Sequence, residues 1–237
     1  MVLNRRKRKN AEEVFQTSAR TENKWKKRRE EVMKANSTSI PENKDPEVTK
    51  VVALDCEFVG AGSSGAKSIL ARVSIVNSKA ECIYDKYVRP TERITDFRTE
   101  FSGIRPANLV NSEPFKKVQL EVRKLIAGRT VVGHALQNDF KVLNILHPRR
   151  LTRDTSKYME FKKTVNKKSP SLKSLAEKIL GINIQNGEHN SVCDPVTSFA
   201  FFLLQPCKRL NHVIDAQVAM RLYQIYRKKW EDDLRKF

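Results

Sequence analysis

The alternation of apolar and polar residues predicts three strands in the first half of the chain. Residues 51–60 form an apolar run that is interrupted by Asp55 and Glu57. In residues 71–75, Ala, Val and Ile alternate with Arg and Ser, and residues 82–88 have a similar pattern. Such alternation is typical of strands with one buried face. We expect these three strands to form an antiparallel meander.

Apolar residues at intervals of three and four predict helices later in the chain. Residues 115–126 and 171–180 have this spacing, and each segment is preceded by a proline and followed within two residues by a glycine. Residues 130–133 are expected to form a short strand, and residues 214–235 a C-terminal helix. Strands first, followed by helices that alternate with short strands, predict an α/β fold with a mixed central sheet flanked by helices.

The length and the charge of the chain predict a disordered tail and an anionic partner. The chain has 237 residues and a formal net charge of +19. We expect one domain over residues 49–237 and a basic, largely disordered tail over residues 1–48. The positive charge indicates nucleic acid as the simplest partner. Basic clusters at residues 5–9 and 26–29 would serve nuclear import, RNA binding or only solubility, and they favour the nucleus or the nucleolus as the location.

The cysteines and the apolar runs exclude two other classes of protein. Cys56, Cys82, Cys193 and Cys207 are widely spaced and contain no C-x-x-C pair, so a zinc site is not expected. The longest apolar run, residues 199–204, is too short for a bilayer span, which needs roughly 20 residues. We therefore expect a soluble protein with reduced thiols and no membrane partner.

Two acids in the first predicted strand are the first candidates for chemistry. Asp55 and Glu57 are two residues apart, so their side chains project from the same face of an extended strand. Like charges this close repel each other unless a cation holds them. Paired carboxylates are ligands that Mg²⁺ or Mn²⁺ prefer. The alternative is an edge strand with a solvated acidic face.

Two further segments carry candidate residues. Asp139 lies just inside a helix that follows the strand at residues 130–133, where by itself it is more simply interpreted as an acid that complements the helix dipole. His189 lies in a polar segment, and Asp194 follows it five residues later. A single histidine in a loop usually has no catalytic role. The combination of Asp55, Glu57, Asp139 and His189 is therefore more informative than any one of these residues.

In chain order, these segments resemble the His-containing subclass of the DEDD 3′–5′ exonucleases, most closely the RNA exonuclease 4 group and its interferon-induced relatives. Residues 53–60 are similar to the first motif of that family, with Phe58 where methionine is more usual. Residues 132–139 resemble the second motif, and residues 153–155 continue the match. The resemblance implies an RNase H-like fold, a cofactor of two Mg²⁺ or Mn²⁺ ions, and single-stranded RNA or DNA with a free 3′ end as the substrate.

The third motif of the family departs from its usual form in this chain. The family places its last metal-binding Asp five residues after the histidine, at the start of a D-A-x-x-A-M-x-L-Y helix. Asp194 has that spacing, whereas Asp215 begins that helix sequence but lies 26 residues after His189. Removing residues 193–213 would restore both features at once. We therefore interpret this segment as an insertion, from a retained intron or a gene-model error, with Asp215 as the fourth acid and Asp194 as the fallback.

The resemblance also implies a role for each site residue. Asp55 would bridge both metal ions, Glu57 and the fourth Asp would hold one, and Asp139 the other. His189 would accept the proton of the attacking water, and nucleoside 5′-monophosphates would be released, most simply in ribosomal RNA processing. Two alternatives remain: an RNA-binding or ribosome-assembly factor whose metal site the insertion has impaired, and a DNA-directed 3′–5′ exonuclease.

A set of basic residues after the second motif would either follow the backbone of the bound strand or belong to an ordinary solvated loop. Two aromatic residues there, Tyr158 and Phe161, would either stack on a base or pack in the core. The basic residues are Arg149, Arg150, Arg153, Lys162, Lys163, Lys167 and Lys168.

Overall fold

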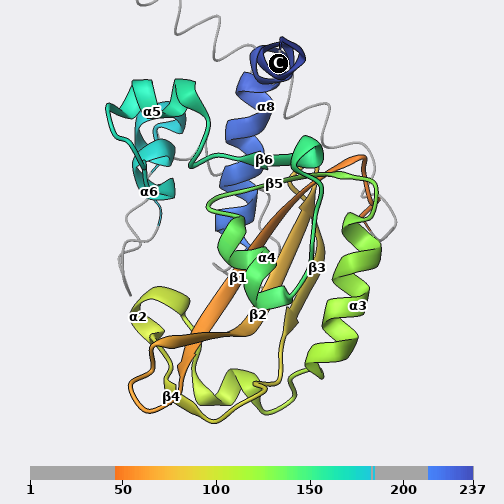
Figure 1. The fold of residues 1–237 in the computed structure, drawn as a ribbon, viewed down its shortest axis with the longest axis vertical. Coiled ribbons are helices and arrows are strands. Elements are labelled where there is room, and N and C mark those ends of the chain that lie inside the picture. The colour runs from red at the N-terminus through yellow and green to blue at the C-terminus, as the bar shows by residue number, and fades with distance from the viewer. Residues whose placement is uncertain (1–45, 183, 185–212, 237) are drawn as a thin grey trace, which may run out of the picture. The chain divides into compact units, whose positions relative to one another are not determined.

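The computed structural model in Figure 1 describes residues 46–182, 184 and 213–236. The predicted basic tail lies almost entirely outside the described residues. So do His189, Asp194 and all but the last residue of the predicted insertion. Their placement therefore stays a prediction.

Six strands of the described residues form one mixed sheet, which confirms the predicted α/β architecture. The strand order is β3-β2-β1-β5-β6, with β4 paired to the end of β1. The first three strands form the predicted antiparallel meander, whereas β5 and β6 run parallel to β1. The strands are β1 Val51–Ala61, β2 Lys67–Asn77, β3 Cys82–Tyr87, β4 Ile94–Asp96, β5 Thr130–Gly133 and β6 Thr152–Asp154.

The helices agree with the apolar spacing of the sequence, with one exception. The predicted helix at residues 171–180 is capped by the Ser171 hydroxyl, but only its first turn is α-helical, and the last turn widens into a π-helix that ends at Gly181. No described helix has the length and apolar character of a membrane span. The helices are α2 Thr99–Ser102, α3 Phe115–Ile126, α4 Gln137–Leu143, α5 Met159–Val165, α6 Leu172–Leu175 and α8 Ile214–Arg235, and the other helical turns are η1 Pro106–Leu109, η2 Arg149–Leu151 and η3 Ala176–Leu180.

Alternate residues of β1 pack on opposite sides of the sheet. Val52 and Leu54 belong to the core that α3 and α4 cover, whereas Val51 and Ala53 belong to the core that α8 covers. In Figure 1, α4 lies in front of the sheet and α8 behind it. By the same alternation, residues 55 and 57 face the side of α8.

The C-terminal half of α8 is anchored by aromatic rings from the segment that contains α5. Trp230 stacks on Tyr158 with ring centroids 4.0 Å apart, and Phe161 packs edge-on against Trp230. Phe161 is fully buried and Tyr158 is 8% exposed, so both aromatics are core residues and not a stacking platform for bases.

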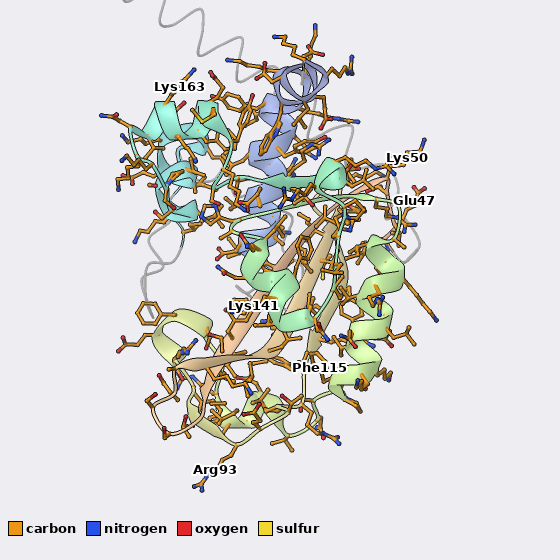
Figure 2. The ribbon with its side chains drawn as sticks, in the orientation of Figure 1. Glu47, Lys50, Arg93, Phe115, Lys141 and Lys163 are labelled. Atoms are coloured by element: carbon orange, nitrogen blue, oxygen red, sulfur yellow. The ribbon has the colours of Figure 1, made fainter. Side chains whose placement is uncertain are left out.

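One residue of the predicted basic surface is buried. The Arg153 guanidinium is 6% exposed and forms two hydrogen bonds of 2.8 Å to the Glu231 carboxylate of α8. The prediction that Arg153 contacts the nucleic acid backbone is therefore wrong, because its charge is already used to join β6 to α8. Figure 2 shows Lys163, by contrast, projecting outward from α5.

We expect Trp230→Ala to destabilise the domain by about 3–5 kcal/mol, because it removes the ring on which Tyr158 and Phe161 pack. Chemical unfolding measures this loss. Ile225→Ala is the matched control, since Ile225 lies on the same helix but is 61% exposed, and its effect should stay within about 0.5 kcal/mol. Equal effects of the two substitutions would contradict the assigned anchoring role.

Candidate active site

The acidic pair lies on β1, the central strand of the sheet. Asp55 is paired across the strands with Ser74 of β2, and Glu57 with Arg72. The strand register shifts directly after Glu57. Since β5 pairs only with residues 51–53 of β1, the two acids extend beyond the end of β5, where helix α4 begins.

The turn between β5 and α4 brings Asp139 to this place. Gly133 leaves no room for a side chain, because a Cβ atom there would lie 2.8 Å from the Leu54 carbonyl oxygen. Ala135 then adopts a left-handed conformation with φ 56°, and its N–H donates to the Asp154 carboxylate at 2.9 Å. Asp139 follows in the first turn of α4 and is 4% exposed. This turn directs the third acid toward β1.

Cys56, between the two acids of β1, links the strand to the third acid. Its side chain is 6% exposed and faces the α4 side of the sheet. The Cys56 thiol donates a hydrogen bond to the Asp139 carboxylate. Burial raises the pKa of this thiol, and the charges of Asp139 and Asp55 raise it further. The thiol therefore stays protonated and acts as a donor.

Helix α8 brings Asp215 to the same acids. Asp215 lies in the first turn of α8, and the buried Gln217 amide one half-turn later donates to the Ala80 carbonyl at 2.9 Å. The charge of Asp215 is close enough to raise the pKa of both Asp55 and Glu57. Three segments far apart in the sequence, β1, α4 and α8, thus converge in one acidic cluster, which we define as Asp55, Glu57, Asp139 and Asp215.

Burial and like charges both disfavour ionisation of the acids in this cluster. Lost hydration and the charges of Asp215, Glu57 and Asp139 raise the pKa of Asp55 well above its usual range. Lost hydration, followed by the charge of Asp215, raises the pKa of Glu57 to about 8. Burial likewise raises the pKa of Asp139 to about 7, although the Cys56 hydrogen bond lowers it. The cluster therefore resists full ionisation near neutral pH unless a cation is present.

The chemistry of the donor set fits a divalent metal ion. Carboxylate oxygens are the ligands that Mg²⁺ and Mn²⁺ prefer, and a cation would remove the repulsion that raises the pKa values. Among the described residues, no three His, Cys, Asp or Glu side chains are already arranged as a closed metal site.

Sequence reasoning missed one charged residue of the site. Arg72 alternates with apolar residues, which predicts a solvent-facing side chain, but it is 3% exposed and lies directly across from Glu57. Ser74, two residues on, is also buried. No local signal could have found it, because the burial of Arg72 depends on its cross-strand partners Glu57 and Tyr87 on β1 and β3.

Solved structures with the same fold contain RNA exonuclease modules. The chain superimposes on the Neurospora crassa Pan2 catalytic unit, which has protease and nuclease domains, with a TM-score of 0.58 and 29% identity over 81% of this chain and 29% of that one. It matches the Saccharomyces cerevisiae Pan2 pseudoubiquitin hydrolase–RNA exonuclease module in complex with AAUUAA RNA with a TM-score of 0.58 and 29% identity, over 81% of this chain and 31% of that one.

Sequence comparison gives the same result. RNA exonuclease 4 of Xenopus laevis is 51% identical over 184 residues, which are 78% of this chain and 39% of the relative, and that of Homo sapiens is 48% identical over the same shares. The Saccharomyces cerevisiae protein of that name is 45% identical over 68% of this chain and 56% of its own length. The chain thus spans between about two fifths and just over half of these relatives. The family model described as Exonuclease (RNase_T) matches residues 52–202. The resemblance and the RNase H-like fold that it implies are thereby confirmed, and the chain belongs to this exonuclease family.

Proposed function

We propose that the chain is a 3′–5′ exonuclease domain that hydrolyses single-stranded RNA from its 3′ end with the help of two divalent metal ions. The observation that carries the proposal is the convergence of four carboxylates from β1, α4 and α8 in one electrostatically coupled cluster. The names of the relatives, RNA exonuclease 4, and the RNA bound to the similar Pan2 module favour RNA as the substrate.

The acidic cluster suggests how the ligands would be divided. Asp55 interacts with each of the other three acids, so it would help to hold both ions. Glu57 and Asp215 would hold one ion, and Asp139 from the opposite side would hold the other. When bound, Mg²⁺ or Mn²⁺ would supply Lewis-acid polarisation of the phosphate and a lower pKa for a coordinated water.

Proton transfer and the orientation of the metal ligands would be carried out by side chains of this protein. His189 would accept the proton of the attacking water, since an unperturbed histidine pKa near 6.5 suits a general base near neutral pH. Cys56 would keep the Asp139 carboxylate oriented through its hydrogen bond. The products would be nucleoside 5′-monophosphates.

Exposed basic residues before β6 and after α5 would hold the RNA backbone. Arg149, Arg150, Lys167 and Lys168 are all exposed, and the chain has an excess of positive charge over its whole length. The basic clusters at residues 5–9 and 26–29 support a nuclear or nucleolar location and a role in ribosomal RNA processing.

We expect Asp55→Asn and Asp215→Asn each to reduce shortening of a 5′-labelled single-stranded RNA by more than about a hundredfold, because changes to the partners of metal ligands alone cost 10–100-fold. Asp194→Asn is the matched control and should keep the wild-type rate. The substrate should resist cleavage when its 3′ end is blocked.

Three other outcomes would contradict parts of the proposal. Loss of activity in Asp194→Asn but not in Asp215→Asn would reverse the assignment of the fourth acid. Salt-sensitive RNA binding without cleavage would indicate an RNA-binding factor whose metal site the segment between His189 and Asp215 has impaired. Faster shortening of a matched DNA would identify a DNA-directed enzyme.

We expect Glu57→Gln to raise the melting temperature of the metal-free protein by roughly 2–4 °C, because it removes one of the repelling charges. Addition of Mn²⁺ should stabilise the wild type more than this variant. Glu121→Gln is the control, since that carboxylate accepts hydrogen bonds from Tyr84 and Lys86 at 2.7 and 2.9 Å, and its loss should lower the melting temperature. A Glu57→Gln protein less stable than the wild type without metal would argue against a repulsive cluster.

A further inference from the structure

A buried arginine lies directly beside the acidic cluster without neutralising it. Arg72 of β2 is the cross-strand partner of Glu57, and the two side chains therefore project from the same face of the sheet. Its charge lowers the pKa of Glu57 and of Asp55, although lost hydration and the other acids raise both by more. Among the described residues, no ion pair joins Arg72 to Glu57.

Arg72 does not pair with Glu57 because other residues hold its guanidinium from the opposite side. Its Nε and Nη2 atoms donate to the two oxygens of Asp85 at 2.7 and 2.6 Å. The Ser74 hydroxyl donates to the same carboxylate at 3.2 Å, and the guanidinium carbon lies 4.8 Å from the centre of the Tyr87 ring. A two-point hydrogen bond combined with an aromatic contact fixes the plane of a guanidinium.

These residues form a stripe across three strands. Asp55, Ser74 and Asp85 are successive cross-strand partners, and so are Glu57, Arg72 and Tyr87. The sheet therefore sets Asp85 on the far side of Arg72 from Glu57. One guanidinium nitrogen, Nη1, is buried and has no hydrogen-bond partner among the described residues. An unsatisfied buried donor is costly, and its persistence requires a strong restraint on the rest of the side chain.

We propose that Asp85 is a positioning residue that restrains Arg72 from closing a salt bridge onto Glu57, and that this restraint keeps Glu57 available to a metal ion. This inference rests on the proposed function. Held by Asp85, Arg72 offsets part of the negative charge of the cluster at a distance. Released from Asp85, the guanidinium would turn its donors to the nearest carboxylate, and a metal ion would then have to displace it before binding Glu57.

The test is the affinity of the full-length protein for Mn²⁺, measured by titration calorimetry without nucleic acid. Asp85→Asn keeps the shape of the side chain but removes the charge that holds Arg72, and we expect it to weaken Mn²⁺ binding roughly tenfold. Arg72→Lys should act in the same direction, because a flexible ammonium lacks the planar fork that Asp85 holds and can reach Glu57.

The double variant Arg72→Met with Asp85→Asn separates this mechanism from simple damage to the fold. It removes the competitor together with its restraint, so Mn²⁺ affinity should return to the wild-type value or exceed it. Glu121→Gln, which breaks an ion pair with Lys86 on the opposite face of the sheet, should leave the affinity unchanged. Circular dichroism of each variant establishes whether it is folded. If Asp85→Asn is not folded, Arg72→Lys alone serves as the single-variant test.

Two results would overturn the inference while leaving the proposed function intact. One is wild-type Mn²⁺ affinity in both folded single variants. The other is a double variant whose affinity is no better than that of Asp85→Asn, which would show that Asp85 acts only through the stability of the sheet. A wild-type protein that binds no Mn²⁺ would instead overturn the proposed function, and with it this inference.

Discussion

The fold has to hold four carboxylates together against two unfavourable effects, their lost hydration and their mutual repulsion. Lost hydration is the largest cause of the raised pKa of Asp55, Glu57 and Asp139, and the charge of Asp215 raises the pKa of Asp55 and of Glu57 further. A fold can keep such groups together only if the segments that carry them are fixed by contacts elsewhere. The stability of the domain therefore has to come from the two cores and not from the site.

Each acid is carried by a segment with its own anchor. β1 lies in the centre of the sheet and is bonded on both sides. The β5–α4 turn is held by the Asp154 carboxylate and by the close approach of Gly133 to β1. Helix α8 is held at its start by Gln217 and near its end by Trp230, far along the helix from Asp215. The carboxylates themselves need no attractive contact with one another to stay in place.

The buried Arg72 is likewise fixed by contacts away from the acidic cluster. A free guanidinium beside Glu57 would form a salt bridge with that carboxylate. A guanidinium that is held by Asp85 and Tyr87 offsets part of the negative charge of the cluster but leaves the Glu57 carboxylate available to a metal ion. Buried ion pairs often add little to stability because desolvation offsets their attraction. In this protein, the Arg72–Asp85 pair has a clearer role as a means of fixing where the positive charge lies.

The strands, most helices and the face from which Asp55 and Glu57 project could be predicted from the sequence, because they follow from local periodicity. The position of Asp139 at the start of a helix after a strand and a glycine was also predictable locally, whereas its place among the candidate site residues came from the family resemblance. The sequence left the fourth acid open between Asp194 and Asp215, and it predicted solvent-facing side chains for Arg72 and Arg153. Only the tertiary structure brought Asp215 to the other acids and buried the two arginines, because α8 and the neighbouring strands supply partners that are distant in the chain. Periodicity predicts the face of the sheet or helix from which a side chain projects. The element that covers that face decides whether a charge there is solvated, paired with another side chain or available to bind a ligand.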